Sequence, residues 1–199
     1  MAERLAILGT GKIGESLLRA LCGQLIEAWR ARAMEKRIIR SIGQPVGDLH
    51  APPDCATLAR CSPAELRAMG LHARRGATLA RLCRSVELER LKDHPSSIVA
   101  ERLGRERGLG AWSVGVVCLE GLGRTEYGLV GDLGLVKLQI ALEGRWVEGH
   151  ETAKLLEPYE EWAGLASVYL MAGFARGLIP LPDGARIRKP PHRISSRAA

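Results

Sequence analysis

The chain has 199 residues, of which 46% are hydrophobic, and carries a formal net charge of +7 at pH 7. This length fits one domain or two small lobes, and the apolar fraction is sufficient for a folded core. No apolar run reaches about 18 residues, so we expect no membrane-spanning helix. We also expect no signal peptide, because the start lacks the basic and apolar regions of one. The excess positive charge favours a polyanionic partner.

The cysteines and histidines show no metal-binding pattern. The cysteines are odd in number and contain no Cys-x-x-Cys pair: Cys22, Cys55, Cys61, Cys83 and Cys118. This usage is typical of thiols in a reducing compartment, where cysteine acts as a small core residue. The five histidines are scattered without the spacing of metal ligands, so we expect no side-chain metal site.

The N-terminal stretch 5–14 is an apolar run followed by Gly-x-Gly-x-x-Gly (Gly-Thr-Gly-Lys-Ile-Gly). This pattern is typical of a strand, turn and helix that bind a dinucleotide pyrophosphate. Such a unit needs a second strand with an acidic residue about twenty residues further on. Residues 27–40 instead predict a charged amphipathic helix, and no alternation of strands and helices follows. Dinucleotide binding therefore stands only as an alternative to a simple helix start.

Apolar residues at helical spacing predict helices through most of the chain. Residues 43–54 are rich in turn formers and predict a connector. The sequence Ser-Pro-Ala-Glu at 62–65 then predicts a helix start with a capping box. Further on, Arg74 and Arg75 open a long helix and either face a polyanion or are solvated, whereas Trp162 is expected in the core. The expected helices are 27–42, one that starts at Ser62, one opened by Arg74 and Arg75, 96–106, one after the hairpin turn, 133–142, 151–159 and 163–175.

The most informative stretch is 103–135. It predicts a helix, a tight turn in which Gly108 and Gly110 flank Leu109, a second helix, a loop, and Asp132 at the start of another helix. The glycines permit positive φ and close backbone approach. The turn presents free amide groups at a helix start, which form a ready site for an anion such as a DNA phosphate. An aspartate before an apolar helix also serves as an ordinary N-cap.

Three parts of this stretch together resemble the helix–hairpin–helix Gly/Pro-Asp (HhH-GPD) superfamily of DNA glycosylases. They are Gly-Leu-Gly-Ala-Trp-Ser at 108–113, Leu-Gly-Arg at 122–124 and Gly-Asp-Leu-Gly-Leu at 131–135. The closest branch is the 3-methyladenine DNA glycosylase II type, which removes alkylated bases. The resemblance extends over about residues 15–178.

The resemblance implies an all-α fold of two helical lobes with an active cleft between them. The expected first lobe is 15–135, with the helix–hairpin–helix at 103–121. The second lobe would combine 1–14 with 136–180. Residues 181–199 are rich in proline and then basic, which predicts a flexible tail that strengthens non-specific DNA binding.

The resemblance also implies the roles of particular residues. Asp132 matches the catalytic aspartate, whose carboxylate stabilises the positive charge that develops on the sugar as the glycosidic bond breaks. The hairpin would grip a phosphate, and Lys137, one turn into the next helix, either meets a phosphate or faces water. The expected DNA contacts are Arg107, Gly108, Leu109, Gly110 and Lys137.

The resemblance implies that three further residues line the pocket for the damaged base. Strand-cleaving relatives carry a lysine two residues after the second hairpin glycine, where this chain has Trp112. The resemblance therefore implies a monofunctional glycosylase. It also implies that Trp112 faces a cationic purine in the base pocket; the alternative is that Trp112 packs in the core of the hairpin. Tyr127 either lines the pocket or packs in the interior. Gln24 either borders the gap left by the extruded base or is a solvated loop residue.

Cofactor expectations follow from the same family. Some relatives hold an iron–sulfur cluster with four cysteines near the C-terminus, but no cysteine follows Cys118, so we expect no cluster and no other cofactor. Relatives also bind a monovalent cation through hairpin carbonyls, here those of Gly104, Glu106 and Leu109. Where the family usually has Leu-Pro-Gly, this chain has Glu-Arg-Gly at 106–108.

The function expected from the sequence is a monofunctional DNA N-glycosylase of base excision repair. Its partner would be double-stranded DNA with a damaged base, with an alkylated purine as the leading substrate, and it would act as a monomer in the cytoplasm at the nucleoid. Two alternatives stay open: a helix–hairpin–helix module that binds DNA without catalysis, and an NAD(P)-dependent reductase suggested by residues 9–14.

Overall fold

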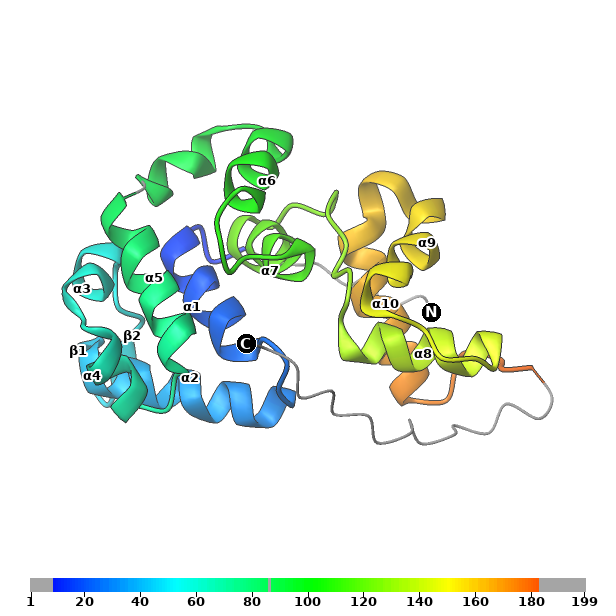
Figure 1. Cartoon of the computed structure of the whole chain (residues 1–199), viewed down its shortest axis with the longest axis horizontal. Coiled ribbons are helices and arrows are strands. Elements are labelled where there is room, and N and C mark those ends of the chain that lie inside the picture. The colour runs from blue at the N-terminus through cyan, green and yellow to red at the C-terminus, as the bar shows by residue number, and fades with distance from the viewer. Residues whose placement is uncertain (1–8, 86, 183–199) are drawn as a thin grey trace, which may run out of the picture.

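A computed structural model describes residues 9–85 and 87–182, which fold almost entirely into helices (Figure 1). Helices α1–α7 gather on one side of the molecule and α8–α10 on the other, joined by the segment after α7 (Figure 1). The predicted all-α fold with two helical lobes is confirmed. None of the helices in the described ranges combines the length and apolar character needed to cross a membrane.

In the described residues, the larger lobe contains seven α-helices, one 3-10 turn and one π-helical turn. They are α1 (Ile13–Gly23), α2 (Ala28–Ile42), α3 (Cys55–Arg60), α4 (Pro63–Ala68), α5 (Ala73–Ser85), the 3-10 turn η1 (Leu88–Asp93), α6 (Ser96–Gly104), α7 (Ala111–Val116) and the π-helical turn η2 (Val117–Gly121). The smaller lobe contains α8 (Leu133–Glu143), η3 (Gly149–Glu151), α9 (Thr152–Leu156), η4 (Glu157–Trp162) and α10 (Ala163–Ala175).

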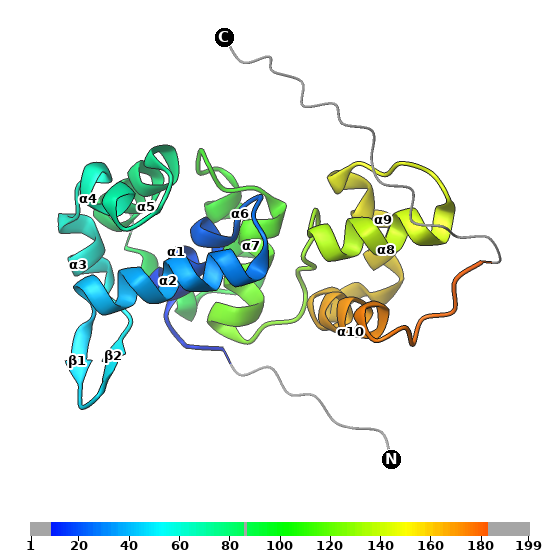
Figure 2. The same cartoon turned by 90° about the horizontal axis from the view of Figure 1, so that it is seen from below.

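The turn-rich connector at 43–54 contains a β-hairpin that the sequence did not predict. Strands β1 (Gln44–Val46) and β2 (Leu49–Ala51) pair antiparallel, with Val46 opposite Leu49 across a two-residue Gly-Asp turn. Gly47 has φ +57, which a two-residue hairpin turn requires. The hairpin projects from the larger lobe, away from the smaller one (Figure 2).

Two apolar clusters hold the molecule together. The first fills the larger lobe around α1, where Leu17, Leu18 and Leu21 are all 0% exposed. The second draws residues from both lobes: Ala20, Val116, Leu119, Leu129, Leu135, Leu156 and Ala163. Since α7 and η2 supply residues to both clusters, they form the shared wall between the lobes.

The described N-terminal residues belong to the larger lobe, not to the smaller one as the sequence suggested for 1–14. The amides of Thr10 and Gly11 donate to the carbonyls of Glu120 and Gly121 at 3.0 and 2.8 Å. This pairing with η2 fixes the entry to α1 from a partner more than a hundred residues away in the chain. Residues 1–8 lie outside the described residues, as do 183–199 of the expected tail.

The glycine-rich start of α1 offers no vacant phosphate cradle. The amides of Ile13 and Gly14 donate to the two carboxylate oxygens of Glu89, at 3.2 and 2.9 Å. A side-chain carboxylate thus occupies the helix N-terminus where a pyrophosphate would bind. The strand expected at 5–8, before the turn, lies outside the described residues. The reductase alternative therefore loses its structural basis.

Candidate active site

The hairpin between α6 and α7 is a compact turn that only glycine permits. Gly108 has φ +96, and a Cβ added there would lie 2.7 Å from Oγ1 of Thr78 on α5. Leu109 is 8% exposed and anchors the turn in the first cluster, so the turn presents its backbone, not this side chain, to a ligand. The first hydrogen bond of α7 runs from the amide of Val114 to the carbonyl of Gly110, at 3.1 Å. The amides of residues 111–113 therefore have no acceptor within the helix, and they can donate hydrogen bonds to a bound anion.

Glu106 braces the hairpin against two helices. Its carboxylate accepts from Arg81 Nη1 of α5 at 2.6 Å and also from Arg102 of α6. Arg81 Nη2 in addition donates to the carbonyl of Arg107 at 3.1 Å. The hydrogen bond from Arg81 holds the pKa of Glu106 below its ordinary value. The departure at 106–108 from the family's usual Leu-Pro-Gly thus has a structural role of its own.

Asp132 and Trp112 meet where the two lobes join. Nε1 of Trp112, at the start of α7, donates to Oδ2 of Asp132 at 2.9 Å. The other carboxylate oxygen, Oδ1, caps α8 by accepting from the amide of Gly134 at 2.7 Å. The aspartate is therefore both the N-cap of α8 and the partner of the indole. Because each oxygen has a donor, the carboxylate is fixed in orientation.

Gly23 makes room for the indole. A Cβ at this last residue of α1 would lie 2.7 Å from Cη2 of Trp112. Trp112 is half-buried and packs against the second cluster. The Cη2 edge of the indole thus abuts the end of α1, and its nitrogen bonds to Asp132.

The segment that leads to Asp132 is tied to the smaller lobe at three points. Gly164 donates to the carbonyl of Thr125 at 2.7 Å, the amide of Leu129 donates to Ser167 Oγ at 3.0 Å, and that of Gly131 donates to Thr152 Oγ1 at 2.8 Å. These bonds attach the segment to α9 and α10. The position of Asp132 relative to the hairpin is consequently set by the packing of the lobes.

Gln24 and Leu25 form the turn after α1, beside the hairpin. Nε2 of Gln24 donates to the carbonyl of Gly108 at 2.9 Å and to Ser113 Oγ at 3.0 Å. Leu25 is 87% exposed and has φ +55, an uncommon conformation for a residue with a side chain. The sequence pointed to this turn only through Gln24. No sequence signal singles out Leu25, because Ile26 beside it is also apolar.

Tyr127 and Lys137, two further predicted site residues, differ in burial. Tyr127 packs against the first cluster, and burial together with nearby Cys118 and Glu126 raises its pKa. The structure thus gives Tyr127 packing contacts, whereas it brings Trp112, Asp132 and Gln24 to the hairpin. Lys137 is exposed on α8, in the second turn after Asp132.

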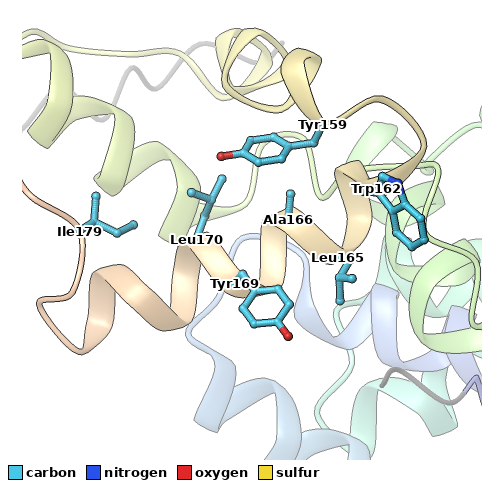
Figure 3. A pocket seen from close by; sticks show the side chains of 7 residues that line it. All are labelled: Tyr159, Trp162, Leu165, Ala166, Tyr169, Leu170 and Ile179. Carbon is cyan, nitrogen blue, oxygen red and sulfur yellow. The ribbon is translucent and has the colours of Figure 1, made fainter. Parts of the chain in front are cut away.

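A separate apolar hollow of about 380 Å³ lies along η4 and α10 of the smaller lobe. Figure 3 shows Trp162 at one end of it and Ile179 at the other, along α10. Trp162 is 55% exposed, so its expected place in the core was wrong. The reason is that α10 turns Gly164 and Ser167 toward the inter-lobe segment and leaves the tryptophan outside. None of the predicted site residues lines this hollow.

Within residues 9–85 and 87–182, no three His, Cys, Asp or Glu side chains gather so that they could hold a metal ion. Of the hairpin carbonyls expected to bind a monovalent cation, that of Glu106 already accepts the amide of Leu109 at 3.1 Å. A carbonyl has a second lone pair, so a cation there stays a prediction.

Comparison by sequence gives no relative: no protein-family model and no curated protein matches the chain. Solved structures do match. A 3-methyladenine DNA glycosylase from Archaeoglobus fulgidus has a TM-score of 0.74 at 19% identity, over 87% of this chain and 61% of that chain. The 3-methyladenine DNA glycosylase of Schizosaccharomyces pombe, solved with abasic DNA, has a TM-score of 0.71 at 18% identity, over 88% of this chain and 86% of that one.

A third match is an 8-oxoguanine glycosylase/lyase of Clostridium acetobutylicum, with a TM-score of 0.72 at 17% identity over 84% of this chain. This chain covers 61% of the clostridial protein, as it does of the archaeal one, and so spans less than two thirds of their length. The protein shares the two-lobed helical fold of these DNA glycosylases.

Proposed function

We propose that the protein is a DNA glycosylase, which flips a damaged base out of duplex DNA and hydrolyses its N-glycosidic bond. The observation that carries this proposal is the carboxylate of Asp132, held by Trp112 and by the amide of Gly134 beside the hairpin. The fold shared with glycosylases of two substrate classes supports it.

The elements around Asp132 suit the extrusion of a nucleotide. The hairpin amides bind a phosphate of the damaged strand. Leu25, exposed and apolar, enters the gap that the extruded base leaves in the stack, and Gln24 supports it from the hairpin side. Unstacking costs a few kcal/mol, and a damaged base that pairs poorly lowers that cost.

Asp132 supplies the negative charge for the chemical step. As the bond between C1′ and the base nitrogen breaks, the base leaves with the bonding electrons and positive charge develops on the sugar. A fixed carboxylate nearby stabilises that charge. Water then bonds to C1′ and gives up a proton, which leaves an abasic site in an uncut strand.

The residue types further support a monofunctional enzyme acting on alkylated purines. Cleavage of the strand through a Schiff base needs an amine at the sugar, and the hairpin position beside Asp132 carries Trp112 instead. The face of an indole attracts a cationic methylated purine by about 0.5–2 kcal/mol. Such a base already carries positive charge, so it departs without a general acid.

A base-release assay on a panel of duplexes tests this proposal. Each duplex carries one lesion (3-methyladenine, 7-methylguanine, hypoxanthine, uracil or 8-oxoguanine), and one half of each reaction receives alkali. We expect release of a methylated purine, with strand breaks only after alkali. Tight binding without release from any duplex would leave a non-catalytic DNA-binding module, and breaks without alkali would contradict the monofunctional mechanism.

A further inference from the structure

The apolar hollow along η4 and α10 has no part in the proposed reaction. Its volume is about 380 Å³, and three aromatic side chains line it together with aliphatic ones. Trp162 lies at one end, Ile179 at the other, and Tyr159 and Tyr169 lie between them (Figure 3). All three aromatic residues are exposed. A contiguous exposed apolar patch of this kind is typical of a surface that binds another chain segment.

Backbone strain occurs at the aromatic end of this hollow. Glu160, between Tyr159 and Trp162 in the chain, has φ +44 and ψ −120 inside η4. A residue with a side chain rarely adopts this conformation, and it persists only where the surrounding structure imposes it. Such residues gather at sites that clamp a ligand. The strain therefore supports a binding role for this corner of the smaller lobe.

Acidic side chains surround the same end. Glu157, Glu160 and Glu161 are exposed on η4. In the described part of the chain none of these three forms an ion pair, whereas Glu143 and Glu151 both pair with Arg145. An unbalanced negative rim beside an apolar floor favours a cationic segment that also carries apolar groups.

Residues 183–199 have this composition, and they follow the opposite end of the hollow. They contain one acidic residue, Asp183, and a proline pair, Pro190 and Pro191. Their cations are Arg186, Arg188, Lys189, Arg193 and Arg197. The described residues end at Pro182, close in the chain to Ile179, which lines that end of the hollow.

The proline pair suits the aromatic wall, and the segment is long enough to bring it there. Proline-rich segments adopt the polyproline II helix, which binds aromatic-lined grooves because little conformational entropy is lost. In that form residues 183–191 span roughly 28 Å, at about 3.1 Å per residue. The helix α10 is only about 20 Å long. Pro190 and Pro191 can therefore reach Trp162 from the end at Ile179.

We propose that residues 183–199 dock into this hollow, with their proline pair against Trp162 and their cations against the glutamates of η4. A segment tethered to the hollow has an effective concentration of about 1 mM there, so even a weak contact keeps it bound. Docking is independent of the proposed glycosylase chemistry. It balances the cations of the segment with carboxylates and so withholds them from other polyanions.

Fluorine NMR of the full chain labelled with 5-fluorotryptophan tests this docking. The chain has four tryptophans, and the variant W162F identifies the resonance of Trp162. Trp146 is the internal control, because it is 52% exposed, close to the 55% of Trp162, and lies outside the hollow. A soluble nitroxide relaxes each resonance according to the exposure of its ring.

We expect the nitroxide to relax Trp162 at least about threefold less than Trp146 in the wild type. The reason is that a contact with a dissociation constant of about 0.1 mM leaves only about a tenth of the chains undocked. In P190G/P191G the two rates should become equal within about 1.5-fold, because glycine does not preset the extended backbone. The matched control in the same segment, S195G/S196G, should keep the difference.

The charges are tested separately. The triple variant E157Q/E160Q/E161Q should lose most of the protection of Trp162, because the cations of the segment then have no partner on η4. The control is E87Q, which removes the same charge from a 70% exposed glutamate of the larger lobe and should keep the protection.

Three results would overturn the proposal. Equal relaxation of Trp162 and Trp146 in the wild type would show that the hollow is open. Protection of Trp162 that remains in P190G/P191G would show that something other than the proline pair covers it. Protection that weakens on dilution would assign the contact to a second copy of the chain instead of the same chain.

Discussion

At the residue scale, the proposed chemistry depends on a side chain that also has a structural role. Asp132 caps α8 with one oxygen and receives the indole of Trp112 on the other. The motif around 108–135 singled out both residues as candidates, because one lies in the hairpin and the other at a helix start. It could not predict Leu25, since neither exposure nor a positive φ is visible in the sequence.

Trp112→Phe separates the hydrogen bond from the ring. Phenylalanine keeps an aromatic face but loses the Nε1–H that orients Asp132. We expect the single-turnover rate of base release to fall about tenfold, in line with the loss of one charge-assisted hydrogen bond. Affinity for an abasic-analogue duplex should stay within about twofold. An unchanged rate would show that the orientation of Asp132 does not depend on Trp112.

Gly23→Ala tests the fit of the indole. The added methyl would lie 2.7 Å from Cη2 of Trp112, so the ring must shift. We expect base release to fall at least about tenfold, because a misplacement of about 1 Å near the chemistry can cost more than that. Gly104→Ala is the matched control, since a Cβ there meets nothing within 4 Å and its helix position favours alanine. Equal activity of the two variants would contradict the packing role of Gly23.

At the element scale, the helices were predictable and their long-range partners were not. Apolar spacing located α2, α8 and α10, and Ser62 and Glu65 form the capping box that their positions indicated. The β-hairpin was not predicted, because its strands are short and the turn formers at 44–51 are equally typical of an irregular connector. The lobe to which 9–14 belongs was not predictable, because its partners, the carboxylate of Glu89 and the carbonyl of Glu120, are distant in the chain and carry no local signal.

Glu106→Gln tests the brace of the hairpin. The ion pair with Arg81 lowers the pKa of Glu106, so the carboxylate stabilises the folded state above its ordinary pKa of 4.5, and this stability is lost as the pH falls below that value. At pH 7 we expect the variant to be less stable by about 1–3 kcal/mol. Its melting temperature should also fall less than that of the wild type between about pH 5 and pH 3. Parallel thermal melts across that range measure the difference. An equal fall in melting temperature for both proteins would contradict a stabilising role of the Glu106 carboxylate.

At the scale of the whole molecule, two lobes meet so that a carboxylate from the start of one lies beside a hairpin from the other. The second apolar cluster holds the lobes together, and the bonds to Thr125, Leu129 and Gly131 fix the segment between them. The family resemblance predicted this division because the hairpin and the aspartate belong to one motif. The boundary at the N-terminus depends on tertiary contacts that no stretch of sequence specifies.

Single-turnover base release by Asp132→Asn tests the central claim most directly. Asparagine keeps an oxygen to cap α8 and nearly the same shape, so the fold and the affinity for an abasic-analogue duplex should be retained. With the negative charge gone, we expect the rate on the best lesion of the panel to fall by at least about 10²-fold. A variant that binds and releases the base at the wild-type rate would show that Asp132 only caps a helix, and the account of catalysis would be wrong.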